Sequence, residues 1–194
     1  MKKVSVITAL VVMMFASGCA HRINITPPLN TISAEGTTKI DKTVGYYISK
    51  EQRDLLITSK GGGGDKVTYL PYAESEPALN QVLSNVYAKV VSLSAPNDKA
   101  ELESKQVAYV FTPTITTTSK SSSAFTWPPT NFTVTIDCKT ADGTGASVWS
   151  KQVTGIGDAE FAEFKHDFSL AARRASKDAF NQLQKEIVGA NALK

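Results

Sequence analysis

The sequence predicts an α+β domain in which a mainly antiparallel sheet carries two helices on one face. Residues 132–139 alternate apolar and polar side chains, the pattern of a strand with one buried face. Residues 79–90 and 172–187 repeat apolar side chains every three or four positions, as in amphipathic helices. The expected order of strands, helix, strand, polar loop, hairpin and helix brings both helices against one sheet.

The first strands are expected ahead of the first helix. Val44–Ser49 and Asp54–Thr58 contain the β-branched, aromatic and apolar residues that favour strands. Gly61–Gly64 invites comparison with a phosphate-binding loop, but the closing Lys-Ser or Lys-Thr pair of that motif is absent. We interpret the four glycines as a hairpin turn or loop tip that leads into residues 67–70.

Two helices are expected to cover the sheet. In the first, Ser75 is a candidate N-cap, Pro77 falls in the first turn, and the end is expected near Leu93. The last helix is expected from about Ser169 to Val188, and its small alanines would allow it to lie close to the sheet. The apolar positions of the two helices are Leu79, Val82, Leu83, Val86, Tyr87 and Val90 in the first, and Ala172, Ala175, Ala179, Leu183 and Ile187 in the last.

The remaining strands follow the first helix. Residues 107–115 are almost continuously apolar at their start, as expected of a central strand. Phe132–Lys139 and Ser147–Val153 flank the turn Ala141-Asp142-Gly143 and predict a hairpin. Cys138 falls on the apolar face of this hairpin, so we interpret it as a buried structural thiol rather than a nucleophile.

The most specific motif lies at the N-terminus, in residues 1–19. Lys2 and Lys3 precede an apolar run of about a dozen residues, which is short of the roughly 20 that span a bilayer. Small residues Ala16-Ser17-Gly18 and then Cys19 follow. This arrangement favours a cleaved signal peptide, with an uncleaved transmembrane helix as the alternative.

The run resembles the bacterial lipoprotein signal, with the lipobox Ala16-Ser17-Gly18-Cys19. The resemblance implies cleavage after Gly18 and acylation of Cys19 on its sulfur and its new amino group. Two or three acyl chains would hold the protein firmly on a membrane, because one chain alone binds only marginally. Residue 20 is Ala and not Asp, which by the family's sorting rule implies the outer membrane, with the protein facing the periplasm.

The expected organisation is therefore a signal peptide over 1–18, a lipidated tether over 19–43 and a single domain over 44–194. The tether is predicted because the segment is polar and interrupted by Pro27-Pro28, so it would let the domain stand off the membrane. As an alternative, its first part could pair as an edge strand.

Charge and cysteine content exclude two classes of protein. Removal of residues 1–18 from the 194-residue chain leaves 176 residues with 19 basic and 18 acidic side chains, a net charge of +1. A nearly neutral chain argues against a nucleic-acid partner, because such binding depends on clustered Lys and Arg. Acylation of Cys19 leaves Cys138 without an intramolecular partner, so no disulfide framework is expected.

No set of residues predicts an active site, a metal centre or a cofactor site. His166 is the only histidine of the expected domain, and the adjacent Asp167 cannot face it in a helix or a strand. Glu160 and Glu163 are one helical turn apart, but no second cluster completes a site around them. We therefore expect a protein that is not an enzyme and uses no cofactor.

A loop before the hairpin is the candidate partner-binding site. Phe125, Trp127, Pro128 and Pro129 combine large apolar surfaces with a restricted backbone, which suits recognition of a partner. In the alternative interpretation, Trp127 folds back and caps the edge of the sheet.

The layout over residues 44–188, together with the lipobox, resembles envelope lipoproteins of the YajG type and, more loosely, lipoproteins with a TolB amino-terminal-like sheet. The resemblance implies an outer-membrane-anchored periplasmic lipoprotein that acts as a non-enzymatic adaptor, regulator or assembly factor. Its partners would be the membrane, through the N-terminal lipid, and an envelope protein or peptidoglycan. One alternative is a glycan or small-ligand binder that uses residues 119–129 and the basic residues of the last helix. A third is an enzyme of envelope polymers around His166.

Overall fold

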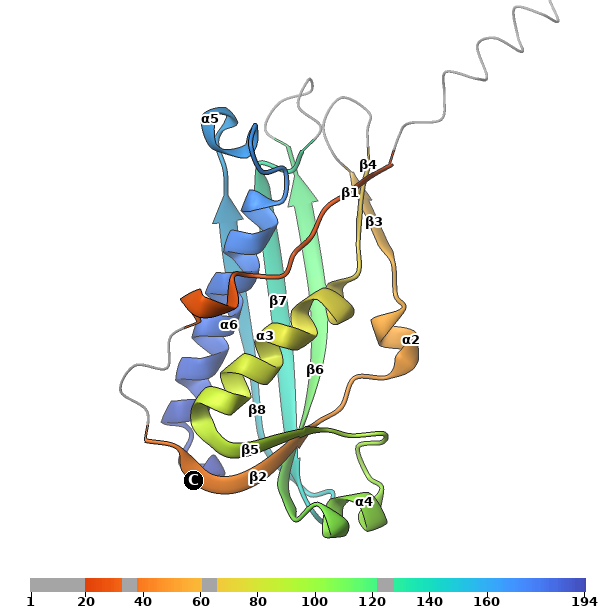
Figure 1. Ribbon diagram of the computed structural model, residues 1–194, viewed down its shortest axis with the longest axis vertical. Coiled ribbons are helices and arrows are strands. Elements are labelled where there is room, and N and C mark those ends of the chain that lie inside the picture. The colour runs from red at the N-terminus through yellow and green to blue at the C-terminus, as the bar shows by residue number, and fades with distance from the viewer. Residues whose placement is uncertain (1–19, 33–37, 61–65, 122–127) are drawn as a thin grey trace, which may run out of the picture.

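A five-stranded mixed sheet forms the centre of the molecule. The computed structural model describes residues 20–32, 38–60, 66–121 and 128–194 (Figure 1). From edge to edge, the strands of this sheet are β5 (Tyr87–Ser92), β2 (Ile40–Tyr46), β6 (Val107–Lys120), β7 (Asn131–Asp142) and β8 (Ser147–Asp158).

A smaller sheet of three strands stands beside the upper part of β6 (Figure 1). Its order is β1 (Ala20–Arg22), β4 (Lys66–Tyr69) and β3 (Ile57–Lys60). The strands β3 and β4 pair antiparallel with Lys60 opposite Lys66, whereas β1 pairs parallel with β4. The predicted glycine turn, Gly61–Gly64, lies outside the described residues.

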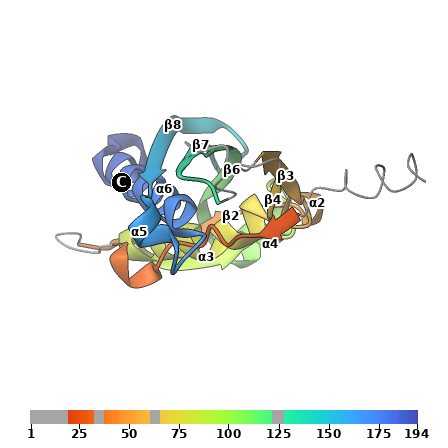
Figure 2. The same ribbon diagram turned by 90° about the horizontal axis from the view of Figure 1, so that it is seen from above.

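Two long helices, α3 (Pro71–Val86) and α6 (Leu170–Gly189), pack against each other on one face of the large sheet (Figure 2). The predicted α+β class is therefore confirmed. Short helical segments complete the fold: η1 (Leu29–Thr31), α2 (Lys50–Arg53), α4 (Lys99–Ser104) and α5 (Phe161–Phe164) in connections, and η2 (Asn191–Leu193) after α6.

The large sheet is more mixed than expected. Strand β2 runs parallel to both of its neighbours, β5 and β6, and antiparallel pairing is confined to β6, β7 and β8. The connections explain this difference. The chain passes through α3 between β2 and β5, and through α4 between β5 and β6, and such crossovers return the chain to the end from which a parallel strand starts.

The first helix ends earlier than the periodicity predicts. It begins at Pro71, places Ser75 in its buried interior and ends at Val86, and residues 87–92 form β5 instead of a last helical turn. The expected N-cap at Ser75 and the expected end near Leu93 are both wrong. Tyr87 is fully buried, as predicted, but on a strand. Pairing with β2 decides the outcome, because residues such as Val90 and Val91 suit a strand at least as well as a helix.

Strand β8 and helix α6 approach each other with almost no side chain between them. A Cβ placed on Gly155 would lie 2.2 Å from the Ala175 carbonyl oxygen, and one on Gly157 would lie 2.0 Å from the Ala171 carbonyl oxygen. The predicted close approach of the alanine-rich helix is therefore confirmed. Glycines on the strand, which the periodicity does not reveal, make it possible.

Side chains of α6 also cover the outer edge of β8. Asp178 Oδ2 accepts a hydrogen bond from the Ile156 amide at 3.1 Å, and Gln182 Nε2 donates to the Thr154 carbonyl at 3.0 Å. The same two side chains are hydrogen-bonded to each other at 3.1 Å. Two of the backbone groups that this edge strand would present to another chain, the Thr154 carbonyl and the Ile156 amide, are thus already engaged.

The N-terminal segment, residues 20–32, packs onto the domain instead of forming a tether (Figure 1). Ile23 and Ile25 are 2% and 0% exposed, and the Ile23 amide donates to the Thr68 carbonyl at 3.0 Å. The Asn24 amide donates to Ser169 Oγ at 3.0 Å. The expected flexible tether over 19–43 is therefore wrong for these residues, and β2 begins at Ile40, before the expected domain boundary at 44. The alternative of an edge strand is confirmed for β1.

The thiol of Cys138 is buried in the core, as predicted. Its residue is 0% exposed, and burial raises the pKa of the thiol to about 12. A thiol that stays protonated and inaccessible is a poor nucleophile. Within the described part of the chain, no helix combines the length and the hydropathy needed to cross a bilayer.

Candidate functional site

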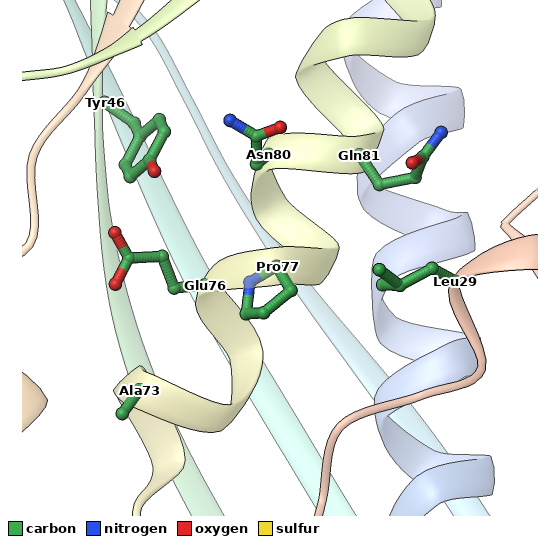
Figure 3. A pocket seen from close by; sticks show the side chains of 7 residues that line it. All are labelled: Leu29, Tyr46, Ala73, Glu76, Pro77, Asn80 and Gln81. Carbon is green, nitrogen blue, oxygen red and sulfur yellow. The ribbon is translucent and has the colours of Figure 1, made fainter.

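An open pocket of about 400 Å³ lies between α3, β2 and η1. Figure 3 shows the Tyr46 hydroxyl, the Glu76 carboxylate and the Asn80 amide gathered on one side, with Leu29 facing Pro77 across the other. The lining residues are Leu29, Tyr46, Ala73, Glu76, Pro77, Asn80 and Gln81.

Pro77 shapes the helical wall of this pocket. It lies inside α3, and its ring nitrogen has no hydrogen to donate to the Ala73 carbonyl, which lies four residues earlier. The hydrogen-bond ladder of the helix is therefore interrupted where the helix lines the pocket. Ala73 and Pro77 together leave a wall of small side chains.

Arg53, which does not line the pocket itself, fixes the carboxylate of Glu76 through a bidentate ion pair. Its Nε and Nη2 atoms donate to the two carboxylate oxygens of Glu76, each at 2.7 Å, and its Nη1 donates to the Ile48 carbonyl at 2.5 Å. The short helix α2 fixes this arginine through a capping box, in which Ser49 and Gln52 exchange hydrogen bonds of 3.1 and 2.9 Å. Such bidentate pairs are both stronger and more directional than single hydrogen bonds.

The charges of the pocket do not favour proton transfer near neutral pH. Hydrogen bonds from Arg53 are the main reason that the pKa of Glu76 lies below its ordinary value, and burial is the main reason that the pKa of Tyr46 is raised. A general acid or base works best with a pKa near the operating pH. The arrangement instead suits the binding of a small polar group by the carboxylate, the hydroxyl and the amides.

A Glu76→Gln variant should be less stable at neutral pH and equally stable in acid. Because the folded pKa of Glu76 is depressed, its contribution is complete above the ordinary value of 4.5 and is lost as the pH falls through the folded pKa. We expect a loss on the order of 1–2 kcal/mol at pH 7, between the values for exposed ion pairs and for buried charged hydrogen bonds. Urea unfolding between pH 7 and pH 3 measures it.

The control for this prediction is Glu103→Gln, the same change at an exposed position on α4. It should leave the urea midpoint nearly unchanged at pH 7. A Glu76→Gln deficit that persisted undiminished at pH 3 would contradict the assigned ion pair.

The candidate acid–base residues of the sequence do not come together. His166 is exposed just after α5, and its backbone amide donates to the Glu163 carbonyl at 3.4 Å. Glu163 pairs with Arg174 at 2.7 Å, and this hydrogen bond is the main reason that its pKa is lowered to about 2. The Glu160 carbonyl accepts the Glu163 amide at 2.9 Å, and the Glu163 carboxylate accepts the Glu160 amide at 3.1 Å. Among the residues that the structure describes, no three His, Cys, Asp or Glu side chains gather as a metal site.

The predicted partner-binding loop is described only at its end. Pro128 and Pro129 are buried, whereas Phe125 and Trp127 lie outside the described residues. The arginines of the last helix, offered above as part of a glycan site, are in ion pairs. Arg173 binds Asp167 and Arg174 binds Glu163.

Sequence reasoning missed the pocket. Glu76 falls where the sequence predicts only the start of a helix, although its side chain faces Tyr46 and Arg53. These residues come from β2, α2 and α3, and Arg53 precedes Glu76 by 23 positions. A glutamate beside an in-helix proline was the available local signal, but no periodic pattern links it to its partners.

Comparisons with known proteins leave the family open. No family model matches the chain, and no curated protein matches it. A solved structure of a Xanthomonas campestris protein, described as family-model DUF330, is 14% identical and aligns over 89% of this chain and 93% of its own, with a TM-score of 0.49. A variant PelC dodecamer from Paraburkholderia phytofirmans is 18% identical over 74% of this chain and 92% of its own, with a TM-score of 0.41.

A third structure is that of a "putative lipoprotein" from Caulobacter crescentus, with 13% identity over 82% of this chain and 91% of its own and a TM-score of 0.37. Likenesses at these identities and TM-scores do not establish a shared function. The resemblance to YajG-type and TolB-like lipoproteins is not confirmed by any of them.

Proposed function

We propose that the protein is a lipid-anchored lipoprotein of the bacterial outer membrane that faces the periplasm and acts as a non-enzymatic adaptor for another envelope component. The observation that carries the proposal is the lipobox Ala16-Ser17-Gly18-Cys19, with Ala at position 20. The first residue after the acylated cysteine is already part of a strand, so the folded domain begins where the signal ends.

An adaptor role rests on two exposed leucines and on the pocket. Leu55 and Leu56 follow Asp54, the C-cap of α2, and are 43% and 52% exposed. These leucines follow Arg53 by two and three residues, and the Arg53–Glu76 pair supplies charged, hydrogen-bonding groups. Apolar residues together with such groups are typical of protein interfaces. We assign this surface, Leu55, Leu56 and the pocket, to an envelope protein partner.

In-cell photo-crosslinking tests the adaptor role. A photoreactive amino acid at Leu56 should give a discrete protein adduct, and the same group at the exposed Ala146, in the β7–β8 turn, should not. Absence of a protein adduct, with purified protein that binds peptidoglycan, would overturn the adaptor role in favour of the glycan-binding alternative.

The variant Cys19→Ser should remove the protein from the outer membrane. Without a sulfur to acylate, the lipid anchor is lost. Even one remaining acyl chain would bind the membrane only marginally. We expect loss of palmitate labelling and a shift from the outer-membrane fraction to the soluble or inner-membrane fraction. Cys138→Ala, which removes the other cysteine of the chain, serves as the control and should stay in the outer membrane.

A further inference from the structure

We propose that one end of this domain rests directly on the bilayer, with Phe161 and Phe168 in the lipid interface. We call it the anchor-proximal end and define it by the strand ends Ala20, Lys66 and Lys120 together with α5. The inference rests on the proposed lipid anchor at Cys19, and it adds an orientation and a contact surface to that function.

No spacer residues separate the proposed lipidated Cys19 from the folded domain. Ala20 follows Cys19 directly, and neighbouring Cα atoms are about 3.8 Å apart. Ala20 pairs with Lys66, and Arg22 Nη2 contacts Glu74 Oε1 at 2.5 Å. The Ile25 amide donates to the other oxygen of Glu74 at 2.9 Å. The segment that would otherwise act as a spacer is therefore attached to α3 and β4.

The strand pairings place several chain ends together at this end. Ala20 is opposite Lys66 in the small sheet, and Lys66 is opposite Lys60. Ser59, which precedes Lys60, contacts Ser119 through the hydroxyl oxygens of both residues at 2.6 Å. This contact joins the small sheet to the end of β6.

The large sheet continues this row. Lys120, at the end of β6, is opposite Asn131, which is opposite Asp158 at the end of β8, where the chain enters α5. Figure 1 accordingly shows α5 at the same end of the long axis as the start of β1.

The same end exposes large apolar side chains. Phe161 is 70% exposed, the highest fraction among the large hydrophobic residues of the described chain, and Phe168 is 46% exposed. Phe161 stacks edge-on against the buried Phe164, with ring centroids 5.5 Å apart, so the core supports its outward position. Aromatic side chains held at a surface suit the interface between lipid headgroups and acyl chains.

The charges nearby are compatible with headgroups. Lys66, Lys120 and Lys165 are exposed at this end and can face anionic phosphates. Two nearby carboxylates are engaged: Asp158 accepts a hydrogen bond from Asn131 at 2.7 Å, and Glu163 pairs with Arg174. A lipid surface is the occupant, rather than a second copy of the chain, because the acylated residue leads out of the fold at this end.

Site-directed fluorescence on the whole mature lipoprotein tests the proposal. Ala162→Cys places a label on α5 and leaves both phenylalanines intact, and Ala146→Cys places one at the exposed β7–β8 turn. Cys138 is fully buried and Cys19 carries lipid, so the label reacts with the introduced thiol. The protein is reconstituted in vesicles of phosphatidylethanolamine and phosphatidylglycerol that contain a spin-labelled lipid.

We expect the label at position 162 to be quenched at least twofold more than the label at 146, and to emit at shorter wavelength. Adding Phe161→Ser and Phe168→Ser to the Ala162→Cys variant should remove most of this difference. Equal quenching at 162 and 146, in protein that still floats with the vesicles, would overturn the contact surface and leave the lipid anchor standing. Protein that does not float with the vesicles would overturn both.

Discussion

Replacing Ile25 with alanine should destabilise the domain by about 2–5 kcal/mol, the usual cost of removing a buried aliphatic side chain. Ile25 is 0% exposed and lies in the N-terminal segment, which packs over α3 and α6. Its side chain leaves a cavity when truncated, because the neighbouring helices are held by their own contacts with the sheet. Urea unfolding followed by circular dichroism gives the change in the free energy of unfolding.

Leu29→Ala is the matched control in the same segment. Leu29 is 37% exposed, so its truncation removes less buried surface and should cost well under half as much. A flexible tether would make both variants equivalent to wild type. An unchanged urea midpoint for Ile25→Ala would therefore contradict the packing of the N-terminal segment. It would also contradict the proposal that no flexible spacer separates the lipid from the domain.

Gly157→Val should also be strongly destabilising. The first added carbon alone would lie 2.0 Å from the Ala171 carbonyl oxygen and 2.4 Å from the Ala175 amide nitrogen. These are backbone atoms of α6, which cannot rotate away as a flexible side chain would. Overpacking commonly costs about 1–3 kcal/mol, and we expect the upper end or beyond because the whole helix must shift from β8.

Thermal unfolding measures this effect, with Gly189→Ala as the control. Gly189 is the last residue of α6, and a Cβ there would meet nothing within 4 Å, so this variant should be neutral or slightly stabilising. A melting temperature for Gly157→Val within error of wild type would refute the close contact between β8 and α6.

Local patterns predicted the elements whose burial follows their own periodicity. The alternation around Cys138 predicted β7, and the alanine stripe predicted α6 almost to its ends. In both cases, the spacing of apolar residues on one face identifies the element. The prediction does not depend on which residues pack against that face, as long as they are apolar.

The first helix shows where such patterns fail. The stripe from Leu79 to Val90 continues with helical spacing, yet the chain changes to a strand at Tyr87. Residues 87–92 pair with the edge of β2. The backbone hydrogen bonds gained in this pairing outweigh the small difference between the helix and strand propensities of these residues. The candidate site was hidden for a similar reason, because Arg53 and Glu76 meet only when α2 is brought against α3.

The sequence by itself determined the features that depend on neighbouring residues: the motif that resembles a lipobox and ends at Cys19, the hairpin of β7 and β8, and the amphipathic face of α6. A peptidase, a turn and a helix each respond to a few consecutive side chains. Only the tertiary structure decided that residues 20–32 pack onto the domain, that β2 pairs parallel on both sides, and that Arg53 holds Glu76. Each of these depends on contacts between distant segments, whose free energy is gained only once the chain has folded.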